Sequence, residues 1–256
     1  MENKAKIKVL IMAGGQGKRM GGDMPKVLAE VAGKPMIKWV LEAVEASMVD
    51  DSPTLVVGYK KELLAQALGD KYEYVIQDSQ LGTGHAVATA EPTLRDKAEN
   101  ILILAGDNPF ITGDTIKKLA DKHLKTNAKV TMGTVHLPDF SDWRKFFYTN
   151  FSRIVRDGGG NILKSVEFKD ATDEEKNILE VNPIYLCFKA SFLWDNLKKL
   201  DKNNAQGEYY LTDLIKIATE ESIKIESIEV PPHDALAANS KEELELLESI
   251  IKTKNE

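Results

Sequence analysis

Short apolar runs alternate with segments of helical periodicity along most of the chain, and this alternation limits the fold more than any other feature. The runs KVLIMA, PTLVVGY and NILILAGD are continuously apolar, as expected for strands buried on both faces. Between the first two runs, residues 34–47 place Ile37, Val40, Leu41 and Val44 at helical spacing. The pattern predicts an α/β fold of Rossmann-like type, with a mostly parallel sheet and helices on both faces.

The same pattern predicts how the chain is organised. We expect a single domain over residues 1–256, because no internal repeat and no low-complexity linker divides the sequence. Residues 153–168 predict a small β-hairpin that turns at three consecutive glycines. Residues 240–253 predict an amphipathic C-terminal helix that begins with a capping box of Ser240 and Glu243.

Charge and cysteine content limit the partners and the compartment. The net charge of -6 disfavours nucleic acid as a partner. The chain begins with charged residues and its first apolar run is too short to span a membrane, so we expect no signal peptide, no membrane partner and a cytoplasmic location. We expect the one cysteine, Cys187, to pack in the buried strand IYLCFK and not to act as a nucleophile.

A glycine-rich loop follows the first apolar run, in the stretch VLIMAGGQGKRMGGDMPK (residues 9–26). It is not a P-loop, because Arg19 stands where that motif needs Ser or Thr, and it is not a Rossmann fingerprint, because its next glycine comes one residue late. Glycines at a strand end let backbone N–H groups approach phosphate, and Lys18, Arg19 and Lys26 add positive charge. The loop therefore predicts a triphosphate site, with a solvated surface loop as the alternative.

Two further strand ends carry polar residues. In QDSQLGTGHAV (residues 77–87), the Gln77 amide suits a base edge, Gly82 permits close backbone approach and Thr83 offers a hydroxyl. In ILILAGDNPF, Asp107 follows a buried strand, where an open α/β sheet binds ligands, and it could hold Mg²⁺. The alternatives are a turn that needs glycine for its geometry and an aspartate that caps a helix.

Two other stretches leave their roles open. In NNAQGEYYLTDLI (residues 203–215), Glu208 and Asp213 could be catalytic carboxylates, but we favour a structural entry into a helix. Residues 140–151 hold six of the chain's 18 aromatic residues. This insertion could be a lid over a pocket, an oligomer surface or local core.

Together, AGGQGKRM, PKVL, QDSQLGTGHAV, GDNPF, VEFKDATDEE and NNAQGEYYLTDL closely resemble the uridylyltransferase (pyrophosphorylase) domain of bacterial N-acetylglucosamine-1-phosphate uridylyltransferases. The resemblance runs from about Val9 to Leu247. It implies a nucleotide-diphospho-sugar transferase fold, with a sugar-side insertion at about residues 136–190. It also implies small-molecule substrates, UTP and a sugar-1-phosphate, and Mg²⁺ as the cofactor.

The resemblance also assigns roles to single residues. Arg19 and Lys26 would be catalytic, with Lys26 against the α-phosphate. The nucleotide would be bound by Ala13, Gly14, Gly15, Gly17, Gln77, Gly82 and Thr83. Sugar hydroxyls would be held by Ser152, Glu167 and Asn182, and Mg²⁺ by Asp107 and Asn239. The alternative for Asn239 is the N-cap of the last helix.

Three departures from the family pattern lie on its sugar side. Ala105 replaces a tyrosine before Gly-Asp, residues 150–153 read Asn-Phe-Ser-Arg in place of Gly-Tyr-Gly-Arg, and residues 182–184 read Asn-Pro-Ile in place of Asn-Thr-Gly. The sequence therefore supports uridylyl transfer better than it supports N-acetylglucosamine as the acceptor.

The expected reaction is in-line attack of N-acetylglucosamine-1-phosphate on UTP, without a covalent intermediate, which releases pyrophosphate. The alternative is transfer to another sugar-1-phosphate or small phosphate acceptor, and a weaker one is a non-catalytic protein that binds nucleotide sugars. Family members commonly continue into an acetyltransferase β-helix. Since this sequence shows no hexapeptide repeats, we expect no acetyltransferase activity and no trimer formed through that domain. The sequence leaves the oligomeric state open.

Overall fold

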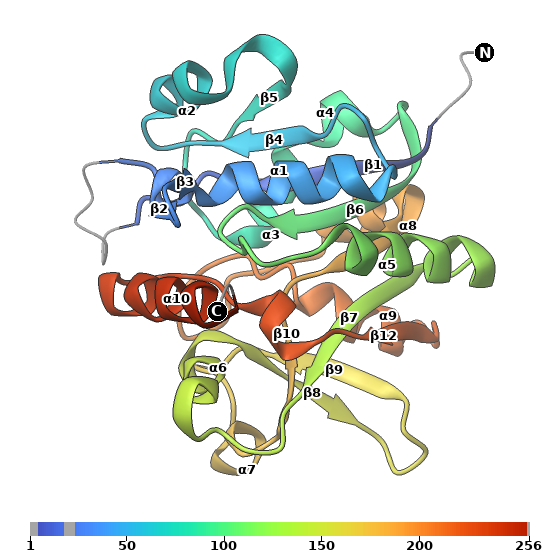
Figure 1. Ribbon diagram of the computed structural model, residues 1–256. Coiled ribbons are helices and arrows are strands. Elements are labelled where there is room, and N and C mark those ends of the chain that lie inside the picture. Colours follow the sequence, from blue (N-terminus) through green and yellow to red (C-terminus); the bar gives the residue numbers. More distant parts are fainter. Residues whose placement is uncertain (1–4, 18–23, 255–256) are drawn as a thin grey trace.

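The computed structural model describes residues 5–17 and 24–254, and a ten-stranded sheet runs through it (Figure 1). The strand order is β5–β4–β1–β6–β11–β7–β10–β8–β9, and β12 pairs with β7. The strands are β1 (Ala5–Met12), β4 (Thr54–Val57), β5 (Glu73–Ile76), β6 (Ala98–Ala105), β7 (Val130–His136), β8 (Ser152–Arg156), β9 (Ile162–Val166), β10 (Glu180–Asn182), β11 (Leu186–Lys189) and β12 (Ile225–Glu229). A separate short pair joins β2 (Glu30–Val31) to β3 (Lys34–Pro35).

The two halves of the sheet differ in strand direction. Strands β5, β4, β1 and β6 are all parallel, whereas β11 is antiparallel to both β6 and β7, and β10 and β9 are antiparallel to their neighbours. Of these ten strands, only β9, β10 and β11 run against the common direction. The prediction of a mostly parallel sheet with an added hairpin is confirmed.

Helices cover both faces of the sheet, as predicted. On β1, Ile7, Val9 and Ile11 face one core and Leu10 faces the other, because side chains alternate along a strand. The first core is covered by α1 (Met36–Ser47), α2 (Lys61–Leu68), α5 (Gly113–Thr126), α6 (Phe146–Asn150) and α10 (Lys241–Lys254). The second is covered by α3 (Thr83–Thr89), α4 (Glu91–Leu94), α8 (Ala190–Leu197) and α9 (Asp213–Glu220).

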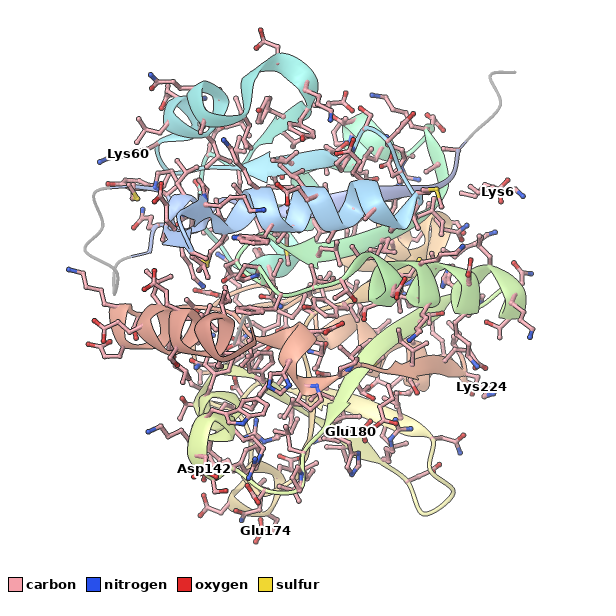
Figure 2. The ribbon with its side chains drawn as sticks, in the orientation of Figure 1. Lys6, Lys60, Asp142, Glu174, Glu180 and Lys224 are labelled. Atoms are coloured by element: carbon pink, nitrogen blue, oxygen red, sulfur yellow. The ribbon has the colours of Figure 1, made fainter. Side chains whose placement is uncertain are left out.

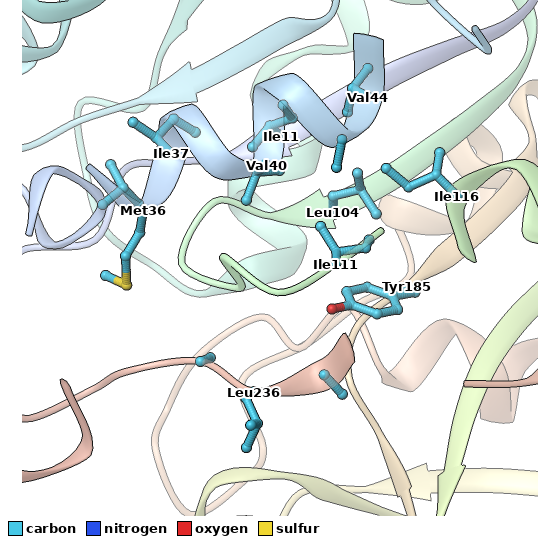
Figure 3. Close-up of a cluster of buried hydrophobic side chains, with 14 of the residues drawn as sticks. Ile11, Met36, Ile37, Val40, Val44, Leu104, Ile111, Ile116, Tyr185 and Leu236 are labelled. Atoms are coloured by element: carbon cyan, nitrogen blue, oxygen red, sulfur yellow. The ribbon is translucent and has the colours of Figure 1, made fainter. Parts of the chain in front are cut away.

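The first core lies between α1, the centre of the sheet and the C-terminal segment. Figure 3 shows Ile37, Val40 and Val44 of α1 close to Leu104 of β6, with Leu236 of the C-terminal segment at the edge of the cluster. All five side chains are fully buried. Burial of one such aliphatic side chain contributes about 1.5–3 kcal/mol. The apolar spacing read from residues 34–47 is therefore the face that docks α1.

Local residues set the ends of several elements. Pro35 lies directly before α1, and Gly69 ends α2 with a φ of 72°, which a residue without Cβ adopts most easily. Within residues 5–17 and 24–254, four short 3₁₀ segments connect the larger elements: η2 (Lys26–Leu28), η3 (Gly69–Lys71), η4 (Asp142–Lys145) and η5 (Pro232–Ala235). The remaining helix, α7 (Asp173–Lys176), begins with a full capping box of Thr172 and Glu175.

Most of the aromatic insertion is local core. Phe146, Phe147 and Phe151 are buried and contact one another, with ring centroids 4.9–5.4 Å apart. Charged side chains such as Lys6, Asp142 and Lys224 lie at the periphery (Figure 2). In the described part of the chain, no helix is both long and apolar enough to span a bilayer. Cys187 is fully buried in β11 and burial raises the pKa of its thiol, which supports its predicted packing role.

Candidate active site

A cavity of about 370 Å³ opens where β1, β5 and β6 end, between the parallel half of the sheet and the hairpin. In an open α/β sheet, ligands bind at this carboxyl edge. Eleven of the fourteen predicted site residues line this cavity: Gly14, Gly15, Lys26, Gln77, Gly82, Thr83, Asp107, Ser152, Glu167, Asn182 and Asn239. The structure thus brings together segments up to 225 residues apart in the sequence.

The described residues of the glycine-rich loop contact Lys26. The backbone N–H of Lys26 donates to the carbonyl of Gly15 over 3.2 Å, and Gly17 has a φ of +62°. A Cβ on Gly17 would lie 3.1 Å from Cα of Lys26, so this position needs glycine for its fold. Of the other predicted residues, Ala13 is buried with its N–H on the carbonyl of Val56, and Arg19 lies outside the described residues.

Lys26, Asp107 and Asn239 meet at one point of the cavity. Nζ of Lys26 donates to Oδ2 of Asp107 and to Oδ1 of Asn239, and Asp107 follows the end of β6. Only 13% of the Lys26 side chain and 20% of the Asp107 side chain are exposed to solvent. Two side-chain oxygens from distant segments thus contact the same positive charge. Mg²⁺ is bound in proteins by one or two such oxygens together with phosphate oxygens. The residues fit the predicted metal.

The side chain of Asn239 is not a helix cap. The cap of α10 is Ser240, whose Oγ accepts the N–H of Glu243 over 3.2 Å. This leaves the Asn239 amide free to face Lys26 in the cavity.

We call the part of the cavity formed by Gly14, Gly15, Gln77, Gly82 and Thr83 the loop wall. Here Gln77 is buried, and its Nε2 donates to the carbonyl of Gly82 over 3.3 Å and lies 3.0 Å from Nδ1 of His85. Gln77 therefore holds the turn before α3 in place, and its role in reading a base stays a prediction.

The stretch NNAQGEYYLTDLI supports this turn from behind. The N–H of Tyr209 donates to Leu81 and its carbonyl accepts from Gly84, both over 2.8 Å. A Cβ on Gly82, which has a φ of +109°, would lie 2.5 Å from the Tyr209 carbonyl oxygen. This contact shows that the stretch supports the turn before α3, while Glu208 of the same stretch lines the cavity.

We call the opposite side, formed by Asn150, Ser152, Glu167, Asn182 and Ile184, the hairpin wall. It is held together by side-chain hydrogen bonds between antiparallel strands and the loops beside them. Oγ of Ser165 lies 2.9 Å from Oγ of Ser152 and accepts from Nδ2 of Asn182 over 3.1 Å. Oδ1 of Asn182 accepts the N–H of Ile184, a β-branched residue with a φ of 60°. Such a backbone costs about 1–3 kcal/mol, and strain of this kind gathers at functional sites.

Glu167 lies in the hairpin wall with a perturbed acidity. Burial raises the pKa of its carboxyl to about 7, although Thr212 donates a hydrogen bond to Oε1 over 2.9 Å. A carboxyl that changes charge near neutral pH beside a ligand cavity can either accept or donate a hydrogen bond to a hydroxyl group. Its predicted contact with a sugar hydroxyl is chemically possible in both forms.

Arg153 fixes the insertion to the hairpin. This fully buried guanidinium donates to the carbonyls of Phe147, Tyr148, Phe151 and Lys176 and lies 4.9–5.5 Å from the rings of Phe140, Tyr148 and Phe168. Burial lowers its pKa to about 10. The residues that Arg153 anchors lead directly into Asn150, Phe151 and Ser152 of the cavity.

Sequence reasoning missed several residues of the site. Ser165 was not singled out, because a lone serine on a strand carries no pattern. Asn108 and Asn150 lie in stretches that we quoted, GDNPF and Asn-Phe-Ser-Arg, but they were given no role. Gln80, whose Nε2 donates to the Gly14 carbonyl, was also missed, although it lies in a motif that we singled out. All three sequence departures, at Ala105, at 150–152 and at 182–184, line the cavity.

Sequence comparison gives a family and several relatives. Residues 9–209 match the MobA-like NTP transferase domain. The bifunctional protein GlmU of Desulfotalea psychrophila is 37% identical over 98% of this chain and 72% of its own length. That of Thermoanaerobacter pseudethanolicus is 42% identical over 95% of this chain and 51% of its own length. The chain thus spans about half the length of several of these relatives.

Structural comparison finds the same fold at low sequence identity. A UDP-glucose pyrophosphorylase in complex with UDP-glucose matches with a TM-score of 0.75 at 17% identity, covering 97% of this chain and 99% of that one. A CMP:2-keto-3-deoxy-manno-octonic acid synthetase in complex with CTP matches with a TM-score of 0.69 at 16% identity, with the same coverage. Both confirm the predicted fold class.

Proposed function

Because the chain belongs to the MobA-like NTP transferase family, we propose that it is a sugar-1-phosphate uridylyltransferase that makes UDP-N-acetylglucosamine and pyrophosphate from UTP and N-acetylglucosamine-1-phosphate. The family match confirms the prediction of a nucleotidyltransferase. The GlmU relatives confirm the resemblance on which that prediction rests.

One observation carries the proposal. Lys26, Asp107 and Asn239 converge between the loop wall and the hairpin wall. Charge neutralisation is therefore concentrated at the junction where two substrates would meet.

The proposed reaction needs positioning and charge neutralisation more than proton transfer. A phosphate oxygen of the acceptor forms a bond to the α-phosphorus of UTP, and the bond from that phosphorus to the bridging oxygen of pyrophosphate breaks. The nucleophile is already an anion, so no general base is needed. The N–H groups of the glycine-rich loop would hold the leaving pyrophosphate. Lys26 would neutralise charge on the α-phosphate of the transferred uridylyl group.

Asp107 and Asn239 would hold Mg²⁺. When bound, the metal would neutralise phosphate charge and orient the phosphates. To receive it, Lys26 must release the two oxygens that it now contacts and turn its ammonium group to the phosphates. The Lys26 side chain would thus contact Asp107 and Asn239 before Mg²⁺ binds and contact the substrate phosphates afterwards.

We also propose a cytoplasmic location, on the basis of the substrates alone.

A second candidate acceptor is favoured by the hairpin wall. Ser152 and Ile184 of this wall, and Ala105 at the end of β6, line the cavity at family motif positions where this chain differs. Another hexose or hexosamine phosphate, or a small phosphate acceptor, could therefore be the substrate with the same nucleotide chemistry.

The test is pyrophosphate release by the purified protein with Mg²⁺ and UTP. We expect turnover with N-acetylglucosamine-1-phosphate to exceed turnover with glucose-1-phosphate. Turnover with glucose-1-phosphate alone would move the assignment to the second candidate. The absence of turnover across a panel of sugar phosphates, with UTP bound, would contradict uridylyl transfer.

A further inference from the structure

One carboxylate ties the hairpin wall to the segment that carries Asn239. Glu243 lies in the first turn of α10. Its Oε1 accepts from Nδ2 of Asn150 over 2.7 Å, and its Oε2 accepts from the backbone N–H of Asn239 over 2.5 Å. Asn150 and Asn239 both line the cavity, although Asn150 is 93 residues from Glu243 in the sequence.

This arrangement goes beyond helix capping. In a capping box, the carboxylate at this position would accept the N–H of the capping residue, here Ser240. Ser240 does accept the N–H of Glu243 as predicted, but the carboxylate bonds the N–H of Asn239, one residue earlier, and also the Asn150 amide. The carboxylate is thus directed to the cavity.

Both bonds end on one small planar group, so a shift of either partner is passed to the other. Nδ2 of Asn150 also donates to the carbonyl of Phe146 over 3.0 Å, so Asn150 is held between α6 and Glu243. An acceptor that displaced Asn150 would displace the Glu243 carboxylate, and through it the backbone N–H of Asn239. Groups that hydrogen-bond a metal-binding residue orient it, and their loss lowers metal affinity by about 10–100-fold.

We propose that Glu243 is a positioning residue that couples binding of the acceptor, a sugar-1-phosphate, to binding of the divalent cation at Asp107 and Asn239. The proposal rests on the proposed function, since it assigns the hairpin wall to the acceptor. It predicts that the affinity for the cation and the KM for the acceptor change together when the bridge is broken.

The experiment compares Glu243→Gln, Asn150→Ala, the double variant and Ser240→Ala. The control, Ser240→Ala, removes the cap of α10 but leaves both bonds of the bridge. Two quantities are measured: the affinity for Mn²⁺ in the presence of UTP without acceptor, by water-proton relaxation, and the KM for the acceptor. Glu243→Gln puts an amide NH₂ where one of the two acceptor oxygens stood, so we expect Mn²⁺ affinity to fall and acceptor KM to rise, each by roughly 10-fold.

Non-additivity separates coupling from two independent losses. If Asn150 acts through Glu243, the double variant changes both quantities by less than the product of the single changes. The proposal is overturned by any of three results: Glu243→Gln changes neither quantity, Ser240→Ala changes both as much as Glu243→Gln does, or the effects of the single variants multiply in the double variant.

If the wild type shows no turnover with any acceptor, the proposed function fails on its own. The Mn²⁺ affinities of Glu243→Gln and Asn150→Ala then decide whether the bridge orients Asn239.

Discussion

The two walls of the cavity are built from different parts of the polypeptide. The loop wall consists largely of backbone, held by glycines at the ends of parallel strands and supported by the Tyr209 backbone. The hairpin wall consists of side chains that hydrogen-bond one another, with Ser165 and Glu243 as the joints. A backbone position packed as tightly as Gly82 cannot accept a side chain without a change in the fold, whereas the side chains of the hairpin wall can be altered by substitution. Two of the three departures from the family motifs, at 150–152 and at 182–184, lie on the hairpin wall, and the third, Ala105, ends the parallel strand β6.

The largest effect should come from the junction of the two walls. We expect Asp107→Ala to lower turnover by about 10³-fold or more at saturating substrates, because it removes a metal-binding oxygen and leaves Lys26 with one partner fewer. Steady-state pyrophosphate release with Mg²⁺, UTP and the acceptor sugar-1-phosphate at saturation measures this change. The matched control is Asp121→Ala, at an exposed carboxylate of α5 whose ion pair with Lys117 lies on the surface. Near-normal turnover of Asp107→Ala would contradict the metal assignment.

Two glycines of the loop wall separate fold from ligand contact. A Cβ on Gly15 meets no atom within 4 Å, whereas a Cβ on Gly82 would clash with Tyr209. We expect Gly15→Ala to keep the wild-type melting temperature and to raise the Kd for UTP by roughly 10²-fold, because the methyl group keeps phosphate from the N–H groups. Isothermal titration with UTP and thermal unfolding measure the two quantities.

Gly82→Ala is the contrasting variant. It should lose stability even without ligand, because its clash is within the protein and its φ of +109° disfavours alanine. If Gly15→Ala binds UTP normally, the loop does not hold phosphate, and the loop wall loses its proposed role.

The third prediction tests whether the hairpin wall acts independently. The planar guanidinium of Arg153 donates to four carbonyls, and the single ammonium group of a lysine cannot replace all of these bonds. Arg153→Lys should therefore make residues 140–151, which include Asn150, less rigidly held. We expect the KM for the acceptor to rise by about 10-fold while UTP affinity stays unchanged.

Arg156→Lys is the control on the same strand, since Arg156 pairs with Glu180 away from the cavity. Equal losses of UTP and acceptor binding in Arg153→Lys would show that the two walls do not behave separately.

The loop wall could be predicted from the sequence, and the joints of the hairpin wall could not. Gly14 and Asp107 follow apolar runs, so their place at the carboxyl edge follows from strand order alone. Arg153 was read only as part of a hairpin, because its partners are backbone carbonyls that leave no mark in the sequence. Ser165 and Glu243 bond residues that become neighbours only after the antiparallel half of the sheet and α10 have packed. The capping box predicted where Glu243 would lie but not which atoms its carboxylate would bond.

The smallest predicted effect is a pH dependence that belongs to the hairpin wall alone. Burial raises the pKa of Glu167 in the folded protein to about 7, above the ordinary value of 4.5 in the unfolded chain. Between these values the folded state holds a proton that the unfolded state has lost, so stability falls as pH rises through 7. From pH 6 to pH 8, ionisation of Glu167 should decrease the free energy of unfolding by about 1 kcal/mol.

Two variants test this contribution. Glu167→Gln cannot ionise and should remove that decrease, as measured by urea unfolding at both pH values. Thr212→Val, which deletes the hydroxyl that bonds Oε1, should make the decrease larger, because that hydrogen bond lowers the pKa. An unchanged pH dependence in Glu167→Gln would show that the carboxyl is solvated in the folded protein and cannot donate a proton to an acceptor hydroxyl at neutral pH.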